Sequence, residues 1–395
     1  MFPVILNVIL FIGLLVFYWF KRRKIDCGFI LVSLYTFVAI LGVFLYISEP
    51  NEWRLMLWPY LYLFFVFLLF AWPILSNKNI NLIEKVEVKS LISLKIICFF
   101  YVVFALYFVL FTSSKAWTYL GTNDWLTIRT DIYNDEGPKI YSNTIQWIAY
   151  AVIMYCNTFA VVIFFYFLTI NKINKIFMSI LFAAVILPMI SWSIITASRG
   201  ILLIFFMLLV ACYIIFKNGF SNKQKKWILM FSVVFVILII IYSIIVTISR
   251  FRHESQFSSL LTYFGHSFMR FNYGVVDTIR EYAGGRIFFK RFYSLLGYND
   301  TMKDLGIHSG NGFITFIGTL YLDWGPLGTL LIALILPFSM NRLFRNTGIA
   351  GIYLYIFYLN YLMQGVFVIG NSNSIEWLLT MIIYFILYKT SRKLR

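Results

Sequence analysis

The sequence predicts an all-α, polytopic membrane protein with about 11 transmembrane helices. Of its 395 residues, 61% are hydrophobic and only 12% are charged, whereas soluble domains carry about 25% charged residues. The mean hydropathy is +0.84. The apolar residues fall into stretches close to the roughly 20 residues that cross a bilayer core. An ordinary soluble fold is therefore excluded. Function must be sought in the few polar residues, because these are costly to hold at a membrane.

We expect one membrane domain over residues 1–395, with predicted spans at 2–20, 28–47, 55–75, 90–111, 144–170, 176–196, 200–216, 227–249, 313–337, 348–368 and 375–388. The last span is short and needs snorkelling ends or a thinned membrane. The sixth and seventh spans are separated only by Ala197-Ser198-Arg199. Together they are too long for one crossing, so we expect a tight hairpin that turns at the arginine.

The distribution of Lys and Arg orients the chain, because these residues favour the cytoplasmic ends of membrane helices. With the N-terminus outside, the cytoplasmic segments hold 20 of the 33 Lys and Arg residues, and their basic excess accounts for the net charge of +17. The C-terminus is then cytoplasmic, and the loops 112–143 and 250–312 lie outside. Topology explains the basic composition, so no nucleic-acid partner is needed.

The N-terminal span is expected to stay in the mature protein. Its basic cluster follows the apolar run, which is the reverse of a secretory signal. The four cysteines lie in or beside predicted spans, which favours apolar packing over a disulfide framework. They are Cys27, Cys98, Cys156 and Cys212.

Several motifs of nucleotide and metal chemistry are missing from the sequence. It has no GxxxxGK[ST], no GxGxxG, no CxxC, no HExxH and no Asp-x-Asp. The predicted cytoplasmic segments are also too short to fold a nucleotide-binding domain. We therefore expect no cofactor and no metal site, and a reaction that runs on a gradient or on an already activated substrate.

The long outer loop, 250–312, is rich in arginine. Arginine holds phosphate or carboxylate through two parallel hydrogen bonds, which lysine cannot do. An apolar face over 257–271, with Ser, Thr and His opposite, predicts an interfacial helix at headgroup depth, where a lipid-linked phosphate would lie. The candidate phosphate-binding arginines of this loop are Arg250, Arg252, Arg270, Arg280, Arg286 and Arg291. Alternatively, they pair with anionic headgroups and with Glu254, Asp277 and Glu281.

Arg199 is a sharper candidate, because it is a single charge at the mouth of the predicted hairpin. Gly200 would allow a tight backbone there, and Ser198 could cap the following helix. A charge in such an apolar setting normally faces a bundle interior or a wet cavity. The alternative is an arginine that snorkels to the headgroups.

Asp323 falls inside the predicted span 313–337. A carboxylate at this depth suggests proton handling or pairing with an arginine. Alternatively, the helix breaks at Gly325-Pro326, and Asp323 accepts hydrogen bonds from the freed backbone.

Three features together resemble a known family. They are the hairpin Thr196-Ala-Ser-Arg199-Gly200, the arginine-rich outer loop, and the run from Asn311 through Gly318, Tyr321 and Asp323 to Gly328. This pattern is similar to the Wzy-type polymerases of oligosaccharide repeat units, which make O-antigen and related polysaccharides. The multi-span layout matches over nearly the whole chain.

The resemblance implies a metal-independent glycosyltransferase in the bacterial inner membrane. It would transfer a growing glycan from undecaprenyl pyrophosphate onto a lipid-linked repeat unit at the periplasmic face. Arg199 and, more loosely, the loop arginines would hold the pyrophosphate, and Asn311 and Asp323 belong to the shared motif. The implied partners are the lipid-linked oligosaccharide, membrane lipids and a chain-length regulator protein.

This chemistry also needs a general base near the acceptor hydroxyl. The candidates, which the sequence does not rank, are His253, His266, His308, Asp277 and Glu281.

Three alternatives stay open, one of which is a structural membrane partner in a glycan-assembly complex. The O-antigen ligases have a loop histidine followed by a GxxG motif, and here His308 precedes Gly325-x-x-Gly328 at a longer spacing. A flippase or transporter of lipid-linked sugar should instead place its charges within the spans. Here, apart from Asp323 and Glu376, the spans are nearly uncharged.

Overall fold

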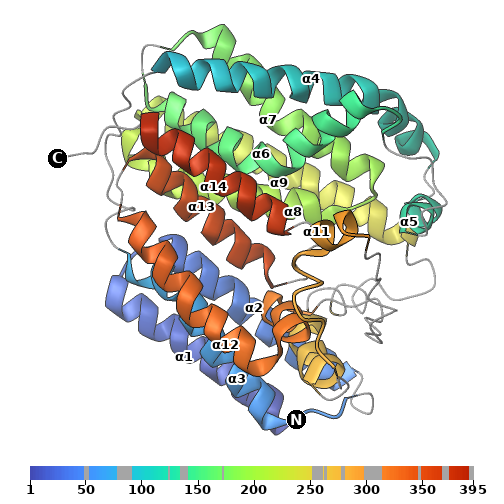
Figure 1. Cartoon of the computed structure of the whole chain (residues 1–395), viewed down its shortest axis with the longest axis vertical. Coiled ribbons are helices and arrows are strands. Elements are labelled where there is room, and N and C mark those ends of the chain that lie inside the picture. The colour runs from blue at the N-terminus through green and yellow to red at the C-terminus, as the bar shows by residue number, and fades with distance from the viewer. Residues whose placement is uncertain are drawn as a thin grey trace. The chain divides into compact units, whose positions relative to one another are not determined.

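A computed structural model gives the fold of the chain (Figure 1). It describes residues 1–48, 53–77, 91–122, 125–133, 141–170, 173–250, 261, 265–276, 281–297, 314–345, 348–366 and 373–390.

Each of the eleven predicted spans is a helix in the structure. These helices are α1 (Phe2–Arg22), α2 (Cys27–Ser48), α3 (Leu57–Ser76), α4 (Leu91–Thr122), α6 (Thr144–Leu168), α7 (Lys175–Ile195), α8 (Arg199–Phe216), α9 (Asn222–Arg250), α12 (Phe316–Phe344), α13 (Ile349–Gln364) and α14 (Asn373–Thr390). Two shorter helices, α5 (Trp125–Tyr133) and α11 (Lys290–Leu295), lie in the two predicted outer loops. The described residues form no strand, so the all-α prediction is confirmed.

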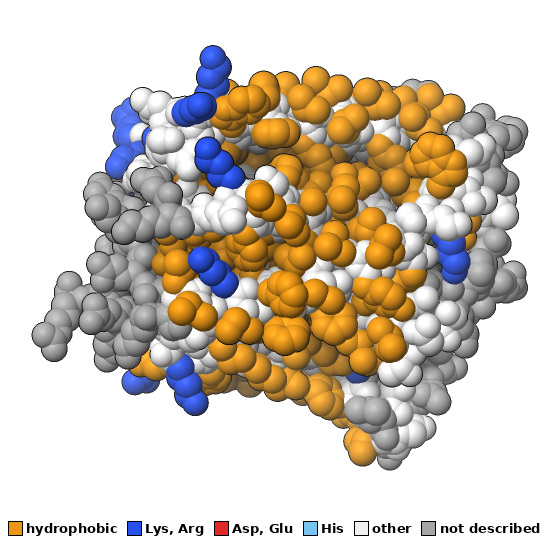
Figure 2. Space-filling model, turned by 90° about the horizontal axis from the view of Figure 1, so that it is seen from above, with side chains coloured by type: hydrophobic (Ala, Val, Ile, Leu, Met, Phe, Trp, Pro, Cys, Tyr) orange, Lys and Arg blue, Asp and Glu red, His pale blue; other side chains and the backbone are white. Residues whose placement is uncertain are grey.

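Nine of the described helices are long and apolar enough to cross a membrane. The remaining two predicted spans, α13 and α14, are helices of 16 and 18 residues. The chain is thus an all-α polytopic membrane protein. Large side chains such as Leu229, Ile237 and Leu331 are exposed in this structure. Figure 2 shows such hydrophobic side chains covering broad areas of one face, as expected of a surface that meets lipid.

The predicted membrane domain divides into two compact units. Unit 1 comprises residues 1–78, 255–345 and 358–378, and unit 2 comprises 79–254, 346–357 and 379–395.

In unit 1, α1, α2, α3 and α12 pack side by side (Figure 1). Helices α1 and α3 run parallel. Their C-terminal ends meet, where the Arg22 side chain of α1 donates to the Leu75 carbonyl of α3 at 2.5 Å. Aromatic rings fill the centre. Tyr35 lies 4.1 Å from Phe67 between ring centroids, and Phe11 contacts both rings. These rings supply much of the unit's apolar burial.

In unit 2, the long helix α4 packs along α7 and α6. The few polar side chains in this packing satisfy one another, as apolar surroundings require. Thr112 and Ser191 share a hydrogen bond of 2.7 Å between their hydroxyls, and neither residue is exposed by more than 7%. Nearby, the ring of Phe108 lies 6.2 Å from that of Trp192.

Part of the outer loop 250–312 is buried in unit 1. A helical turn over 265–270 continues into a π-helical turn, Phe271–Val276. Ser267, Phe268, Met269 and Phe271 are all at most 1% exposed. A helix in the membrane surface should keep a polar face in water, and here consecutive residues on all sides are buried. Over its described part, the predicted interfacial helix is instead a packed segment of unit 1.

Candidate functional site

The predicted hairpin between α7 and α8 is present, and three residues, 196–198, turn the chain. Its tight backbone lies at Ala197, whose φ is +48°, and not at Gly200, which is helical. A left-handed alanine costs about 1–2 kcal/mol. Packing holds it, because Ala197 is fully buried against Trp125, Ile128 and Val246.

Hydrogen bonds also fix this turn. The Ser193 hydroxyl donates to the Ser198 carbonyl at 2.7 Å, and the Ser198 N–H donates to the Ser193 carbonyl at 3.0 Å. Tyr242 of α9 donates to the same Ser193 carbonyl at 2.8 Å. Ser198 occupies the N-cap position of α8, but its side chain makes no capping hydrogen bond. The expected side-chain cap is therefore wrong.

Arg199 is the first residue of α8, and its side chain is only 5% exposed. Its guanidinium donates to the hydroxyl of Thr247 on α9. The Thr247 hydroxyl in turn donates to the Ser243 carbonyl, which fixes its direction. A buried cation at the N-terminal end of a helix adds to the positive potential that the helix already has there. This position therefore favours an anionic ligand.

Arg129, on α5, is a second arginine at this turn. Its guanidinium donates to the Thr196 carbonyl at 2.9 Å. Arg129 was not among the residues to which a role was assigned from the sequence. The signal available was its position in the outer loop that precedes the hairpin. We call Arg129, Arg199 and residues 196–198 the arginine turn.

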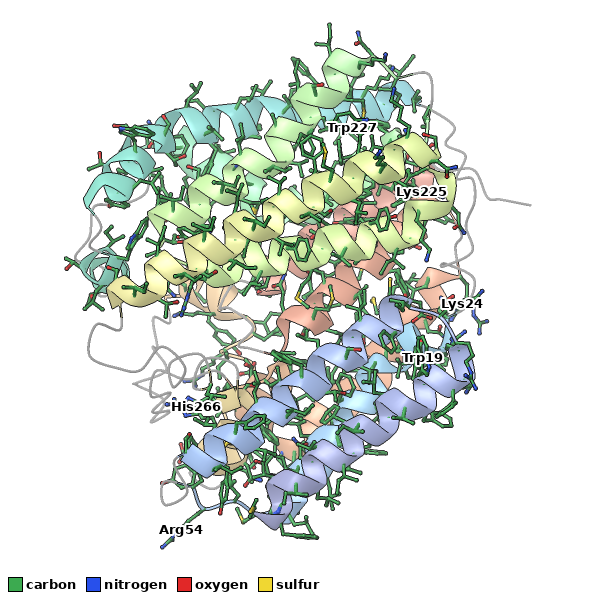
Figure 3. All side chains as sticks on the ribbon, turned by 180° about the vertical axis from the view of Figure 1, so that it is seen from behind. Trp19, Lys24, Arg54, Lys225, Trp227 and His266 are labelled. Carbon is green, nitrogen blue, oxygen red and sulfur yellow. The ribbon has the colours of Figure 1, made fainter. Side chains whose placement is uncertain are left out.

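His266, in unit 1, lies on the buried turn 265–270 and is 9% exposed. Its ring and the Trp53 ring form a T-shaped pair, with ring centroids 5.0 Å apart. Arg270 follows four residues later, on the same helix face. Burial, followed by the positive charge of Arg270, lowers the pKa of His266 to about 4. Burial also lowers the pKa of Arg270. His266 is thus neutral near pH 7, and a pKa this far below 7 makes it a weak proton acceptor. Figure 3 labels His266 among the side chains.

Two contacts hold the helical segment 265–276 against the rest of unit 1. The Asn272 side chain accepts from the Met56 N–H at 2.9 Å and donates to the Met56 carbonyl at 2.7 Å. Gly265 lies directly against α2, where a Cβ atom would come within 2.8 Å of the Leu41 carbonyl oxygen. Glycine is therefore required at this crossing.

Asp323 lies at a break in α12, because Gly325 has φ +70° and is not helical. The predicted break at Gly325-Pro326 is confirmed. The carboxylate accepts from the N–H groups of Ile287 and Phe288, at 3.1 and 3.0 Å. The expectation that it bonds the freed backbone of its own helix is therefore wrong. Its partners are amides of the outer loop.

The freed carbonyls of α12 bond the same loop segment. Pro326 has no N–H to offer the Leu322 carbonyl, and that carbonyl accepts from the Ala283 N–H at 3.0 Å. The Asp323 carbonyl accepts from the Gly284 N–H at 2.7 Å. We call residues 282–289 the strap, because four of its backbone amides bind this one helix break. It holds Arg286 exposed at the surface, shortly before the exposed Arg291.

The other predicted site residues are located as follows. Glu281 is exposed at the start of the strap, and Arg250 ends α9. Outside the described residues lie His253, His308, Asp277, Arg252, Arg280 and Asn311. Within the described part of the chain, no three His, Cys, Asp or Glu side chains gather as metal ligands would.

The structure thus brings His266 together with Arg270, Asp323 with the strap, and Arg199 with Arg129. Comparisons with protein-family models, curated proteins and solved structures found no match to this chain. Its class is therefore defined by the architecture alone: a polytopic, all-α membrane protein whose described part has a buried arginine, Arg199, at the start of a helix.

Proposed function

We propose that this protein is a Wzy-type polysaccharide polymerase. It transfers a growing glycan from undecaprenyl pyrophosphate onto a lipid-linked repeat unit, as an integral protein of the bacterial inner membrane. The donor is already activated, so the reaction consumes no nucleotide. This agrees with the lack of nucleotide-binding motifs in the sequence.

The observation that carries the proposal is the arginine turn. Arg199 is 5% exposed and heads a membrane helix, and Arg129 binds the same three-residue turn. Two guanidinium groups and a helix N-terminus favour an anion with several oxygens, such as a pyrophosphate. In glycosyl transfer, the bond between the anomeric carbon and the pyrophosphate oxygen breaks, and the oxygen keeps the electron pair. Positive groups placed where this charge develops lower the barrier.

His266 is the described candidate for the general base. It is neutral near pH 7, with the cation of Arg270 one turn away. As the acceptor hydroxyl bonds to the anomeric carbon, its proton would pass to the imidazole. Among the other candidate bases, Glu281 is exposed. The remaining three lie outside the described residues.

The proposed orientation has the N-terminus outside, the C-terminus in the cytoplasm and the reaction at the periplasmic face. It follows from the distribution of Lys and Arg. The proposed partners are the lipid-linked oligosaccharide, membrane lipids and a chain-length regulator protein.

The length distribution of surface glycans in a deletion strain tests this function. Loss of a polymerase should leave single repeat units attached to lipid A, and the wild-type gene should restore long chains. Loss of all repeat units would instead indicate a ligase or a flippase, and unchanged chain lengths would contradict any of these roles.

A further inference from the structure

Among the buried side-chain atoms of unit 1 that have no hydrogen-bond partner within the described part of the chain, three belong to residues of one packing region. They are Asn7, Tyr60 and Ser267, which are 1%, 0% and 0% exposed. The atoms concerned are the Asn7 Oδ1, the Tyr60 hydroxyl and the Ser267 Oγ. Buried polar atoms in native proteins are almost always bonded to protein or to ordered water. These three require a common explanation if they lie at one level of the helix packing.

The packing register places Asn7 level with Tyr60. Helices α1 and α3 are parallel, and the Arg22–Leu75 contact joins residues 53 apart in the sequence. Phe11 and Phe64, with ring centroids 5.2 Å apart, keep the same spacing about three turns earlier. Asn7 and Tyr60 continue it one further turn along each helix. The two side chains therefore share one layer.

Ser267 belongs to that layer as well. Two residues before it, Gly265 touches α2 at Leu41. One residue after it, Phe268 stacks on Phe11 with centroids 5.5 Å apart. On α2, Thr36 is level with Phe11, because its hydroxyl donates to the Phe11 carbonyl at 3.2 Å. Leu41 lies one to two turns beyond Thr36 on α2, in the direction of the end of α1 that carries Asn7. Ser267 thus lies between the levels of Asn7 and Phe11.

We propose that ordered water binds between Asn7, Tyr60 and Ser267. The donor and acceptor balance fits water. The Asn7 Oδ1 can only accept, and the two hydroxyls can donate or accept. Buried water typically makes about three hydrogen bonds to otherwise unsatisfied groups. The bound water would tie the segment carrying His266 and Ser267 to α1 and α3, so it is part of how the candidate base is docked.

Radiolytic hydroxyl-radical footprinting of the full chain in lipid nanodiscs tests the proposal. Buried side chains beside bound water are oxidised, whereas equally buried side chains in dry packing are not. Tyr60 should be labelled. Tyr35 and Tyr358 are matched controls, because both are 0% exposed and donate to protein carbonyls, those of Leu362 and Phe70. Tyr60 as unreactive as these two tyrosines would overturn the proposal.

Two further measurements separate the remaining explanations. In Ser267→Ala, labelling of Tyr60 should fall while labelling of Tyr35 and Tyr358 stays unchanged. The same result is expected in Asn7→Leu if that variant folds. Unchanged Tyr60 labelling in Ser267→Ala would indicate bulk solvent and contradict a held water. Replacing sodium by choline should leave wild-type labelling and the unfolding temperature unchanged. A sodium-dependent shift would indicate a bound cation in place of water. None of these readouts depends on polymerase activity.

Discussion

Arg199 combines burial, a single charge and a rigid position at the start of a membrane helix. An arginine that snorkels to headgroups keeps its guanidinium in the interface, whereas Arg199 is 5% exposed and bonds Thr247. Of the two interpretations left open by the sequence, this burial argues against the snorkelling side chain, and the anion-holding role is our proposal. A buried guanidinium is expensive to maintain, which is consistent with a functional role.

Substitution of Arg199 should therefore abolish polymer. Arg199→Ala removes the cation, and Arg199→Lys should recover little, because a point ammonium does not replace a planar fork of donors. Glycan chain length at equal protein level measures the effect. Arg345→Ala is the control, because Arg345 is exposed at the end of α12, and it should leave long chains. Normal polymer in Arg199→Ala would show that the arginine turn is structural only.

His266 gives the protein a pH-dependent stability with a defined sign. Its pKa is about 4 in the folded state, against 6.5 ordinarily. As pH falls from 6.5 toward 4, the unfolded chain takes up the proton first. The free energy of unfolding therefore decreases across this window. Above the window, the neutral His266 makes its full contribution to that free energy. Wild type should lose more thermal stability than His266→Gln between about pH 7.5 and about pH 4.5. Parallel losses in the two proteins would contradict a buried neutral histidine.

The strap and the break in α12 form one element of structure. Asp323 and the carbonyls freed by Pro326 bind four strap amides. Asp323 thus positions the strap, which carries Arg286 and lies directly before α11 with Arg291. A proton-handling role for Asp323 is less well supported, because both of its carboxylate oxygens accept hydrogen bonds from backbone amides.

Replacing Asp323 should loosen the strap. In Asp323→Ala, trypsin should cleave after Arg286, Lys290 and Arg291 faster than in wild type, because these sites lose their anchor. Asp26→Asn is the control. Asp26 is also buried in unit 1, but it bonds the Tyr18 hydroxyl and the Phe29 N–H, so cleavage in the strap should not change. Equal cleavage rates in Asp323→Ala and wild type would refute the anchoring role.

Long periodic elements could be predicted from the sequence, and local polar pairings could not. Apolar length placed all eleven helices, and Gly325-Pro326 marked the break in α12. The predicted interfacial helix around 257–271 was misassigned over its described part, because Ser267 and His266 look polar in sequence and are buried by tertiary packing. Arg129 was overlooked because its partner, the Thr196 carbonyl, is 67 residues away and carries no sequence signal.

At the scale of the whole molecule, the charge distribution predicts the topology. Reporter fusions at Ser255 and Arg395 should report a periplasmic and a cytoplasmic location, respectively. The excess of Lys and Arg in the predicted cytoplasmic segments is the physical reason. A cytoplasmic signal at Ser255 would reverse the whole arrangement and place the strap and His266 on the wrong side for the proposed reaction.

Chain growth by the purified protein tests the central claim most directly. In lipid, it should join undecaprenyl-pyrophosphate-linked repeat units without ATP, without a nucleotide sugar and in the presence of EDTA. The reason is that arginines, Arg199 foremost, would stabilise the leaving pyrophosphate in place of a metal ion. Long lipid-linked glycans should form under these conditions, and none should form with Arg199→Ala. Growth that stopped on chelation and returned with Mg²⁺ would contradict the arginine mechanism.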